Sequence, residues 1–339
     1  MGWYAPSFRL AQNHDTLCYT VRIADLSVIV VSFNSAGWLR PCLESIFAHA
    51  GTCTLDVIVV DNASTDGSAE LVEREFPQAR VLRNENRGFA HANNRGFEIS
   101  NAPYTLFINP DTEIRNGTFS DLLDALAARP SVGLVGCRQV TADGTLYPTI
   151  RRFPTPVRQL CEALGSERLP VRPSWTGHRE LDAAAYDRET RCDWVSGSFM
   201  LARREAVIQA GLMDERYFLY CEETDFCAAM VAAGWEIRYL PQMTFVHHDS
   251  KTGYNSRLVA QQAYAHRQYF HKHNGPVRRT FSTAALGLFY ARRAVVPARD
   301  DPDATAQRDA ARAGLRTLLG AAPPPFGELS GPVSGPRRR

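Results

Sequence analysis

Three short runs of mostly apolar, β-branched residues constrain the fold of this chain more than any other feature. Residues 26–32 read Leu-Ser-Val-Ile-Val-Val-Ser, residues 56–60 read Asp-Val-Ile-Val-Val, and residues 104–108 read Tyr-Thr-Leu-Phe-Ile. Runs of this length and composition are typical of strands that are buried on both faces. Segments with helical spacing and short connections lie between them, for example at residues 39–47. The alternation predicts an α/β fold with a doubly wound, mostly parallel sheet and helices on both faces.

The 339 residues allow one large α/β domain together with a smaller addition. The pattern of apolar residues weakens after Gly275, and the last residues are rich in Gly and Pro. Residues 139–190 have no clear period, which is typical of a functional loop region. We therefore predict an N-terminal extension at 1–24, a main α/β domain at 25–274, a helical C-terminal extension at 275–320 and a disordered tail at 321–339.

The composition narrows the class of protein. A formal net charge of +2 gives no indication of a nucleic-acid partner, and eight cysteines without a Cys-x-x-Cys pair argue against a zinc site or a disulfide scaffold. No apolar run approaches the roughly 20 residues of a membrane span, and residues 1–24 lack the apolar core of a signal peptide. We expect a cytoplasmic protein. Apolar residues and arginines mix in residues 278–299, which predicts either peripheral contact with the inner face of the cell membrane or a helix packed on the main domain.

Polar side chains follow four of the predicted strands at the points where these strands end. They are Ser32 and Asn34, Asp61, Asn109 and Asp111, and His247. In open α/β sheets ligands bind at the edge where the carboxyl ends of the strands meet. A single Asp after a strand often only caps a turn, but four such positions favour a binding site. The Gly-rich loops that commonly hold phosphates are missing, so a protein that binds a diphosphate here needs a metal ion, for which a carboxylate is a suitable ligand.

Six motifs in a fixed order extend this reading from residue 26 to about residue 250. They are VIVVSFN at 28–34, VVDNASTDGS at 59–68, NRGFAHANNRG at 86–96, NPDT at 109–112, GSFML at 197–201 and FLYCEETD at 218–225. In this order and spacing the sequence resembles the family 2 glycosyltransferases with the GT-A fold, and among them the bacterial group of rhamnosyltransferases. Several of the motifs are weak individually, whereas their combination is specific.

The resemblance implies a site for a nucleotide. Asp61 would hold the base, and Ser32 and Asn34 would line the same pocket. The segment that begins at Gly88 would pack under the nucleotide, with Asn94 matching an asparagine of the family.

The resemblance also implies a site for a divalent cation, Mg²⁺ or Mn²⁺. Asn109 and Asp111 stand where the family has Asp-x-Asp, and Asp111 matches the member that binds the metal. Asn109 removes one negative charge from this motif, and we expect it among the residues that bind the nucleotide. His247 matches a late histidine that helps to bind the metal or the phosphate, whereas the neighbouring His248 is expected to be an ordinary surface or core histidine.

A general base is implied by the acidic cluster at residues 222–225. It matches Glu-Asp-x-Asp of the family, whose second residue is the base, so Glu223 is the first candidate and Asp225 the second. Glutamate in place of aspartate moves the carboxylate by about one C–C bond, a shift of the size that affects rate. The alternative is a purely structural role, in which the acids only stabilise the start of a helix, because carboxylates are favoured at a helix N-terminus.

We predict an inverting, metal-dependent glycosyltransferase for cell-surface polysaccharide synthesis. The donor would be a nucleotide sugar, either dTDP-rhamnose or a UDP-sugar, and the acceptor a glycan or a lipid-linked glycan. One alternative is a sugar-nucleotide-processing enzyme, which would need a Gly-rich basic loop that residues 32–34 do not offer. The other is an inactive binding or scaffold protein of the same fold, suggested by the departures at Asn109 and Glu223.

Overall fold

The computed structural model describes residues 23–166, 173–248, 255–296 and 303–328. The N-terminal extension predicted at 1–24 lies almost wholly outside these residues, as do the last eleven residues of the predicted tail.

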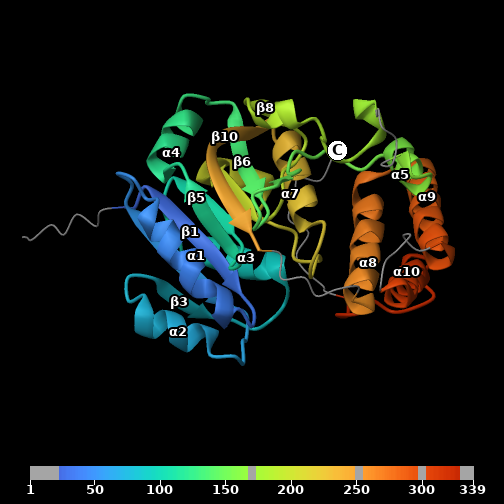
Figure 1. Ribbon diagram of the computed structural model, residues 1–339, viewed down its shortest axis with the longest axis horizontal. Helices are drawn as coiled ribbons and strands as arrows, with labels where there is room; N and C mark the ends of the chain where they lie inside the picture. The colour runs from blue at the N-terminus through green and yellow to red at the C-terminus, as the bar shows by residue number, and fades with distance from the viewer. Residues whose placement is uncertain (1–22, 167–172, 249–254, 297–302, 329–339) are drawn as a thin grey trace, which may run out of the picture.

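A large mixed sheet forms the centre of the molecule (Figure 1). Its strand order is β3-β2-β1-β4-β9-β6-β10-β5. The first four strands in the chain pair in parallel, and three of them, β1, β2 and β4, are the runs recognised in the sequence. The prediction of a doubly wound, mostly parallel sheet is therefore confirmed. The strands are β1 (Leu26–Ser32), β2 (Leu55–Asp61), β3 (Arg80–Arg83), β4 (Tyr104–Ile108), β5 (Thr112–Asn116), β6 (Val132–Val140), β7 (Leu146–Tyr147), β8 (Thr190–Cys192), β9 (Phe199–Arg203) and β10 (Glu236–His247).

Antiparallel pairs complete the second half of the sheet. β9 lies antiparallel between β4 and β6, β10 runs parallel to β6, and β5 pairs antiparallel with β10. The sequence did not reveal β5, since its five residues include charged side chains and its pairing partner lies more than 120 residues away. This pairing brings the end of β10 beside the residues that follow β4.

Helices cover both faces of the sheet, and every residue of β1 is therefore buried. One apolar layer includes side chains from α1 (Ala36–Ala48), α2 (Ser68–Glu75) and α4 (Phe119–Ala127). The opposite layer includes side chains from α3 (Phe89–Glu98), α6 (Arg204–Ala210) and α7 (Glu222–Ala232). In the second layer the ring of Phe107 on β4 contacts Phe226 edge to face at a centroid distance of 6.0 Å.

A group of helices stands beside α7, at the right of Figure 1. It consists of α5 (Pro156–Ala163), α8 (Ser256–His273), α9 (Pro276–Val295) and α10 (Ala304–Leu318). Buried side chains of α8, α9 and α10, such as Phe270 and Leu318, form one cluster with Tyr217 and Cys221, which precede α7. The packing therefore groups α8 with the C-terminal helices, although the sequence suggested a boundary after residue 274.

Two further segments differ from what the sequence suggested. The irregular region at 139–190 contains α5, whose signals were a capping Thr155 and Pro156 at the first helical position. Residues 321–328, part of the predicted disordered tail, pack on the body of the protein. Phe326 stacks on Phe218 at 4.2 Å between ring centroids, and the guanidinium of Arg257 lies 4.2 Å from the Phe326 centroid.

Candidate active site

The carboxyl ends of β1 and β2 bring together residues of the predicted nucleotide pocket. Ser32 and Asp61 are neighbours in the parallel register and are 0% and 4% exposed. Oγ of Ser32 and Oδ1 of Asp61 are buried and have no hydrogen-bond partner in the described part of the chain. Since buried polar atoms are nearly always paired, these two atoms mark a place where a ligand group would be bound.

Asn34 shapes the loop above this pocket. Its φ angle is 50°, and its Oδ1 accepts a hydrogen bond from the backbone N–H of Thr65 at 2.9 Å. Ala63, in the facing loop after β2, also has a positive φ of 64°. Such strained backbone at non-glycine residues is common at functional sites. The predicted pocket residues Ser32, Asn34 and Asp61 therefore lie together.

Gly88 holds the start of α3 against the segment that precedes α7. Its φ is 102°, and a Cβ at this position would lie 2.5 Å from the carbonyl oxygen of Phe218. The same oxygen accepts a hydrogen bond from the N–H of Phe89 at 2.8 Å. A glycine is required here both by the backbone angle and by the close contact.

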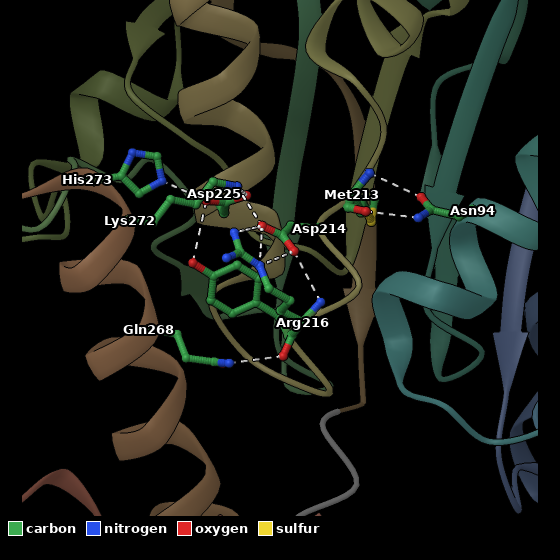
Figure 2. A network of polar contacts seen from close by, with 9 residues as sticks. Asn94, Met213, Asp214, Arg216, Asp225, Gln268, Lys272 and His273 are labelled. Carbon is green, nitrogen blue, oxygen red and sulfur yellow. Dashed lines mark hydrogen bonds and ion pairs between the residues drawn. The ribbon is translucent and has the colours of Figure 1, made fainter. Parts of the chain in front are cut away.

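Asn94 uses its amide inside the protein rather than in a ligand pocket. Its Nδ2 donates to the carbonyl oxygen of Met213 at 2.8 Å, and its Oδ1 accepts from the Met213 N–H at 3.0 Å (Figure 2). Nδ2 also donates to Oε1 of Glu215 at 3.0 Å. Both donors are occupied and the residue is 4% exposed. The direct nucleotide contact suggested by the sequence does not fit this geometry, because the hydrogen bonds of Asn94 are made to the turn after α6.

Asn109, Asp111 and His247 meet at the end of β4 and β10. Oδ1 of Asp111 lies 3.0 Å from Nε2 of His247, and Nδ2 of Asn109 lies 3.2 Å from the same nitrogen. Oδ1 of Asn109 is buried without a hydrogen-bond partner among the described residues. On the other side of the ring, Nδ1 of His247 is 3.4 Å from Nε2 of Gln139. A carboxylate, an amide and an imidazole thus converge on one point, and they belong to the residues for which the sequence predicts cation binding.

His248 has a separate structural environment. Its ring stacks on Trp38 at a centroid distance of 5.0 Å, and its Nε2 lies 3.2 Å from Oε2 of Glu113. These contacts join α1, β5 and the end of β10, in agreement with the ordinary role expected for this histidine.

A short segment before β9 lies between Asn109 and the acidic cluster at the start of α7. The carbonyl oxygen of Ser198 accepts a hydrogen bond from the Asn109 N–H at 3.1 Å, and its Oγ donates to Oε1 of Gln139 at 3.1 Å. The preceding residue, Gly197, packs against Glu223, whose Cβ would be 3.5 Å from a Cβ built on the glycine. Gln139 and Ser198 were not recognised from the sequence, because an isolated Gln and Ser carry no local signal.

The N-terminus of α7 presents Glu222 and Glu223. Two strained residues precede it, since Tyr220 and Cys221 have φ angles of 72° and 66°. Oε2 of each glutamate is buried and has no partner among the described residues. Burial raises the pKa of both carboxyls, that of Glu222 well above its usual value because it also faces Glu223. Backbone N–H groups and Arg151 oppose the rise in the pKa of Glu223. The environments therefore separate the two acids, as is usual where one of them acts as a base.

Asp225 is held in an ion-pair network (Figure 2). Its Oδ2 accepts from Nζ of Lys272 at 2.7 Å, its Oδ1 lies 2.6 Å from Nε2 of His273, and its side chain is 2% exposed. Lys272 also donates to Oδ2 of Asp214 at 2.7 Å. The prediction of Asp225 as a second candidate base does not fit this geometry, because both of its oxygens are occupied. The residue instead ties α7 to the C-terminal end of α8.

Comparison with known proteins places this site in a family. The sequence profile of glycosyl transferase family 2 matches residues 27–207, more than half of the chain. The chain belongs to this family. It is 31% identical, over 66% of its own length and 76% of the other protein, to the N-acetylglucosaminyl-diphospho-decaprenol L-rhamnosyltransferase of Mycobacterium tuberculosis. It is 22% identical to the rhamnosyltransferase WbbL of Escherichia coli, over 66% of this chain and 85% of WbbL.

The fold of this glycosyltransferase also matches a solved structure. The mannosyltransferase PcManGT of Pyrobaculum calidifontis, in complex with GDP-Man and Mn²⁺, superposes with a TM-score of 0.54 at 19% identity, covering 89% of each chain. The expected GT-A architecture and the resemblance to family 2 are thereby confirmed. The family itself sets aside the alternative of a sugar-nucleotide-processing enzyme.

Proposed function

We propose that this glycosyltransferase is inverting and metal-dependent, and that it transfers rhamnose from dTDP-rhamnose to a lipid-linked glycan in cell-surface polysaccharide synthesis. Two relatives are named rhamnosyltransferases, and the name of one specifies a sugar linked through a diphosphate to a lipid. A UDP-sugar is the alternative donor.

The observation that carries the proposal is the buried, partnerless carboxylate oxygen of Glu223 at the start of α7. This oxygen would accept the proton of the acceptor hydroxyl while the hydroxyl oxygen forms its bond to the anomeric carbon. The bond from that carbon to the diphosphate would break on the opposite side, which inverts the configuration. Such base catalysis contributes about 100- to 10,000-fold in rate. A raised pKa suits this role, because a stronger base takes the proton more readily.

Asp111 and His247 would hold the cation, with Asn109 beside them. Their carboxylate, imidazole and amide groups meet within 3.0–3.2 Å, and an unpaired amide oxygen at the same place fits a ligand set for Mg²⁺ or Mn²⁺. The described residues contain no group of three or more acidic, His or Cys side chains sufficient for a metal, so diphosphate oxygens of the donor would complete the shell. When bound, the cation supplies positive charge that stabilises the departing diphosphate.

The remaining site residues divide into two kinds. Ser32 and Asp61 have free buried oxygens and would contact the nucleotide directly. Asn34, Gly88 and Asn94 would act indirectly, because their contacts lie within the protein and shape the loops around the pocket.

A thermal-shift panel tests the proposal. The full chain would be heated with dTDP, UDP and GDP and their sugars, with Mn²⁺ or Mg²⁺ and with EDTA. A ligand at 100 times its Kd stabilises a protein by about 2.7 kcal/mol, which is readily measured. We expect a metal-dependent shift with dTDP and dTDP-rhamnose that is lost in Asp111→Ala. A chain that responds to no nucleotide would support the inactive-scaffold alternative instead.

We also propose peripheral contact with a membrane surface through α9. Val277, Phe281, Leu288 and Val295 are 69%, 65%, 44% and 74% exposed and follow one another at helical spacing. The same helix carries Arg278 and Arg279 near its start, and a basic helix with an exposed apolar stripe suits anionic lipid. Within the described chain, no helix combines the length and apolar character that crossing a membrane requires.

Flotation with vesicles that contain anionic lipid tests this contact. The double substitution Phe281→Asp and Leu288→Asp changes only exposed side chains and should reduce recovery with the vesicles severalfold. Equal recovery of variant and wild type would contradict the contact. A change in oligomeric state without a change in flotation would show that the stripe binds a second copy of the chain.

A further inference from the structure

A cavity of about 350 Å³ lies between the main domain and the C-terminal helices. Side chains of α5, α7, α8 and α9 line it together with residues from the irregular region before β8. Glu223, the proposed base, faces into the cavity. A group bound there would therefore lie next to the carboxylate that takes the proton of the acceptor.

Arg151 in the wall of this cavity is not in ion-pair contact with any described carboxylate, although its charge acts on Glu223 from a greater distance. Its Nε is buried without a hydrogen-bond partner, and no described carboxylate forms an ion pair with it. Burial lowers the pKa of its guanidinium, which reflects the cost of removing the charge from water. A buried cation is costly unless an anion compensates it, so the position of Arg151 is explained if a ligand brings the anion.

The conformation of Arg151 is fixed before a ligand binds. Its backbone bridges Arg179 on one side and Trp194 on the other, with an N–H···O hydrogen bond of 3.0 Å to the Trp194 carbonyl. Its guanidinium carbon lies 5.8 Å from the ring centroid of Tyr147 and 5.5 Å from that of Trp194. Aromatic rings hold the planar guanidinium well, and a fixed fork of donors suits the oxygens of a phosphate.

The other charges of the cavity favour an anion as well. Arg179 and Arg293 line it with Arg151, and the guanidinium of Arg293 lies 4.6 Å from the ring centroid of Phe289. The acids are Glu223 and Glu162, and Nε2 of His178 lies 3.4 Å from Oε2 of Glu162.

The two histidines in the wall do not change this balance at neutral pH. Burial lowers the pKa of His178 to about 3, and burial also lowers the pKa of His266. Both rings are neutral, and the arginines provide the positive charge.

We propose that this cavity is the acceptor site and that Arg151 binds a phosphate of an acceptor whose sugar is linked through a diphosphate. The inference rests on the proposed function and deepens it, because it selects a charged acceptor over a neutral glycan. With its phosphate at Arg151, the acceptor would have its sugar between the arginine and Glu223. The donor diphosphate belongs to the separate point formed by Asp111 and His247.

Isothermal titration of the full chain with two probes tests the proposal. One probe is N-acetylglucosamine diphosphate carrying a short alkyl chain, and the other is the uncharged alkyl N-acetylglucosaminide. At physiological salt, the wild type should bind the diphosphate probe at least about tenfold more tightly, the size expected for one charge-assisted contact. Arg151→Gln should lose this preference, and Arg151→Lys should keep part of it because the charge remains. Arg312→Gln, which removes an exposed arginine of α10, is the matched control and should bind as the wild type does.

The thermal shift with dTDP-rhamnose, measured on the same samples, separates the outcomes. The proposal is overturned if the wild type does not prefer the diphosphate probe, or if Arg151→Gln binds it as tightly. It is also overturned if Arg151→Gln weakens dTDP-rhamnose equally, since the arginine would then serve the donor. Sugar transfer that does not depend on Arg151 would leave the proposed function intact while this inference fails. If the diphosphate probe binds through Arg151 but no sugar is transferred, this inference holds and the proposed function fails.

Discussion

Lys272 should be one of the main stabilising side chains of this protein, although it lies outside the recognised motifs. It joins two carboxylates from different segments, Asp214 and Asp225, at 2.7 Å each. Both carboxylates are almost fully buried, at 1% and 2% exposure, whereas the lysine is 23% exposed. The replacement Lys272→Met preserves most of the side-chain volume and removes only the charge.

The loss of stability in Lys272→Met depends on which ion-pair partners Asp214 and Asp225 keep. Removing one partner of a buried pair costs about 3–5 kcal/mol when the other charge is left without compensation. Here Asp214 keeps Arg216, and Asp225 keeps His273. We therefore expect Lys272→Met to lower the free energy of unfolding by about 2–3 kcal/mol. The double variant with Asp225→Asn should cost less than the sum of the single changes by about 1–2 kcal/mol, since the two residues interact directly.

The same ion pairs should make the stability of the protein depend on pH in the acid range. Burial by itself would raise the pKa of Asp214, but hydrogen bonds from Arg216 and Lys272 lower it from 3.8 to about 2. A depressed pKa gives stability that is present above the unfolded value and is lost as the pH falls towards the folded value. The shift corresponds to at most about 2 kcal/mol after allowance for solvent screening. Wild-type stability should fall between pH 4 and pH 2, and Lys272→Met should lose less over this range.

Urea denaturation followed by circular dichroism measures both effects. Arg312→Met is the control, because its partner Asp309 is exposed and such pairs contribute about 0–1 kcal/mol. The structural role of these ion pairs would be refuted if the free energy of unfolding of Lys272→Met were within about 0.5 kcal/mol of the wild-type value and fell equally between pH 4 and pH 2.

Three further predictions concern the site itself. Gly88→Ala should destabilise the protein by about 1–3 kcal/mol in urea, because its Cβ would meet the Phe218 carbonyl, whereas Gly144→Ala has a similar positive φ in open space and should cost less. Asp61→Ala should weaken dTDP binding by about 10- to 100-fold in isothermal titration, and unchanged binding would remove Asp61 from the pocket. The transfer rate should fall on the acid side at a pH above 4.5, because burial raises the pKa of Glu223 and the protonated carboxyl cannot accept a proton. A rate that stays constant down to pH 4.5 would contradict this.

Much of the sheet could be predicted from the sequence because its parallel strands are short, apolar runs. The runs at 26–32 and 104–108 became β1 and β4 with those bounds. The antiparallel strand β5 escaped recognition, since its stability comes from β10, far along the chain, and not from its own composition.

The candidate site was predictable only in part, for the same reason. Residues at strand ends, such as Asp61 and Asp111, could be placed at one edge of the sheet from the order of the elements. Asp225 could not be separated from Glu223, because the partner that occupies it, Lys272, is 47 residues away. Arg151 lies in a region without any period, and its importance depends on the lack of an ion-pair contact with any carboxylate in the described structure.

A transfer assay with Glu223→Gln tests whether Glu223 is the base of a sugar transfer. Rates with dTDP-rhamnose and the lipid diphosphate acceptor would be compared with those of the wild type, with dTDP binding as the control for folding. If Glu223 is the base, the rate should fall by about 100- to 10,000-fold while nucleotide binding is retained. Transfer by Glu223→Gln at the wild-type rate would contradict it.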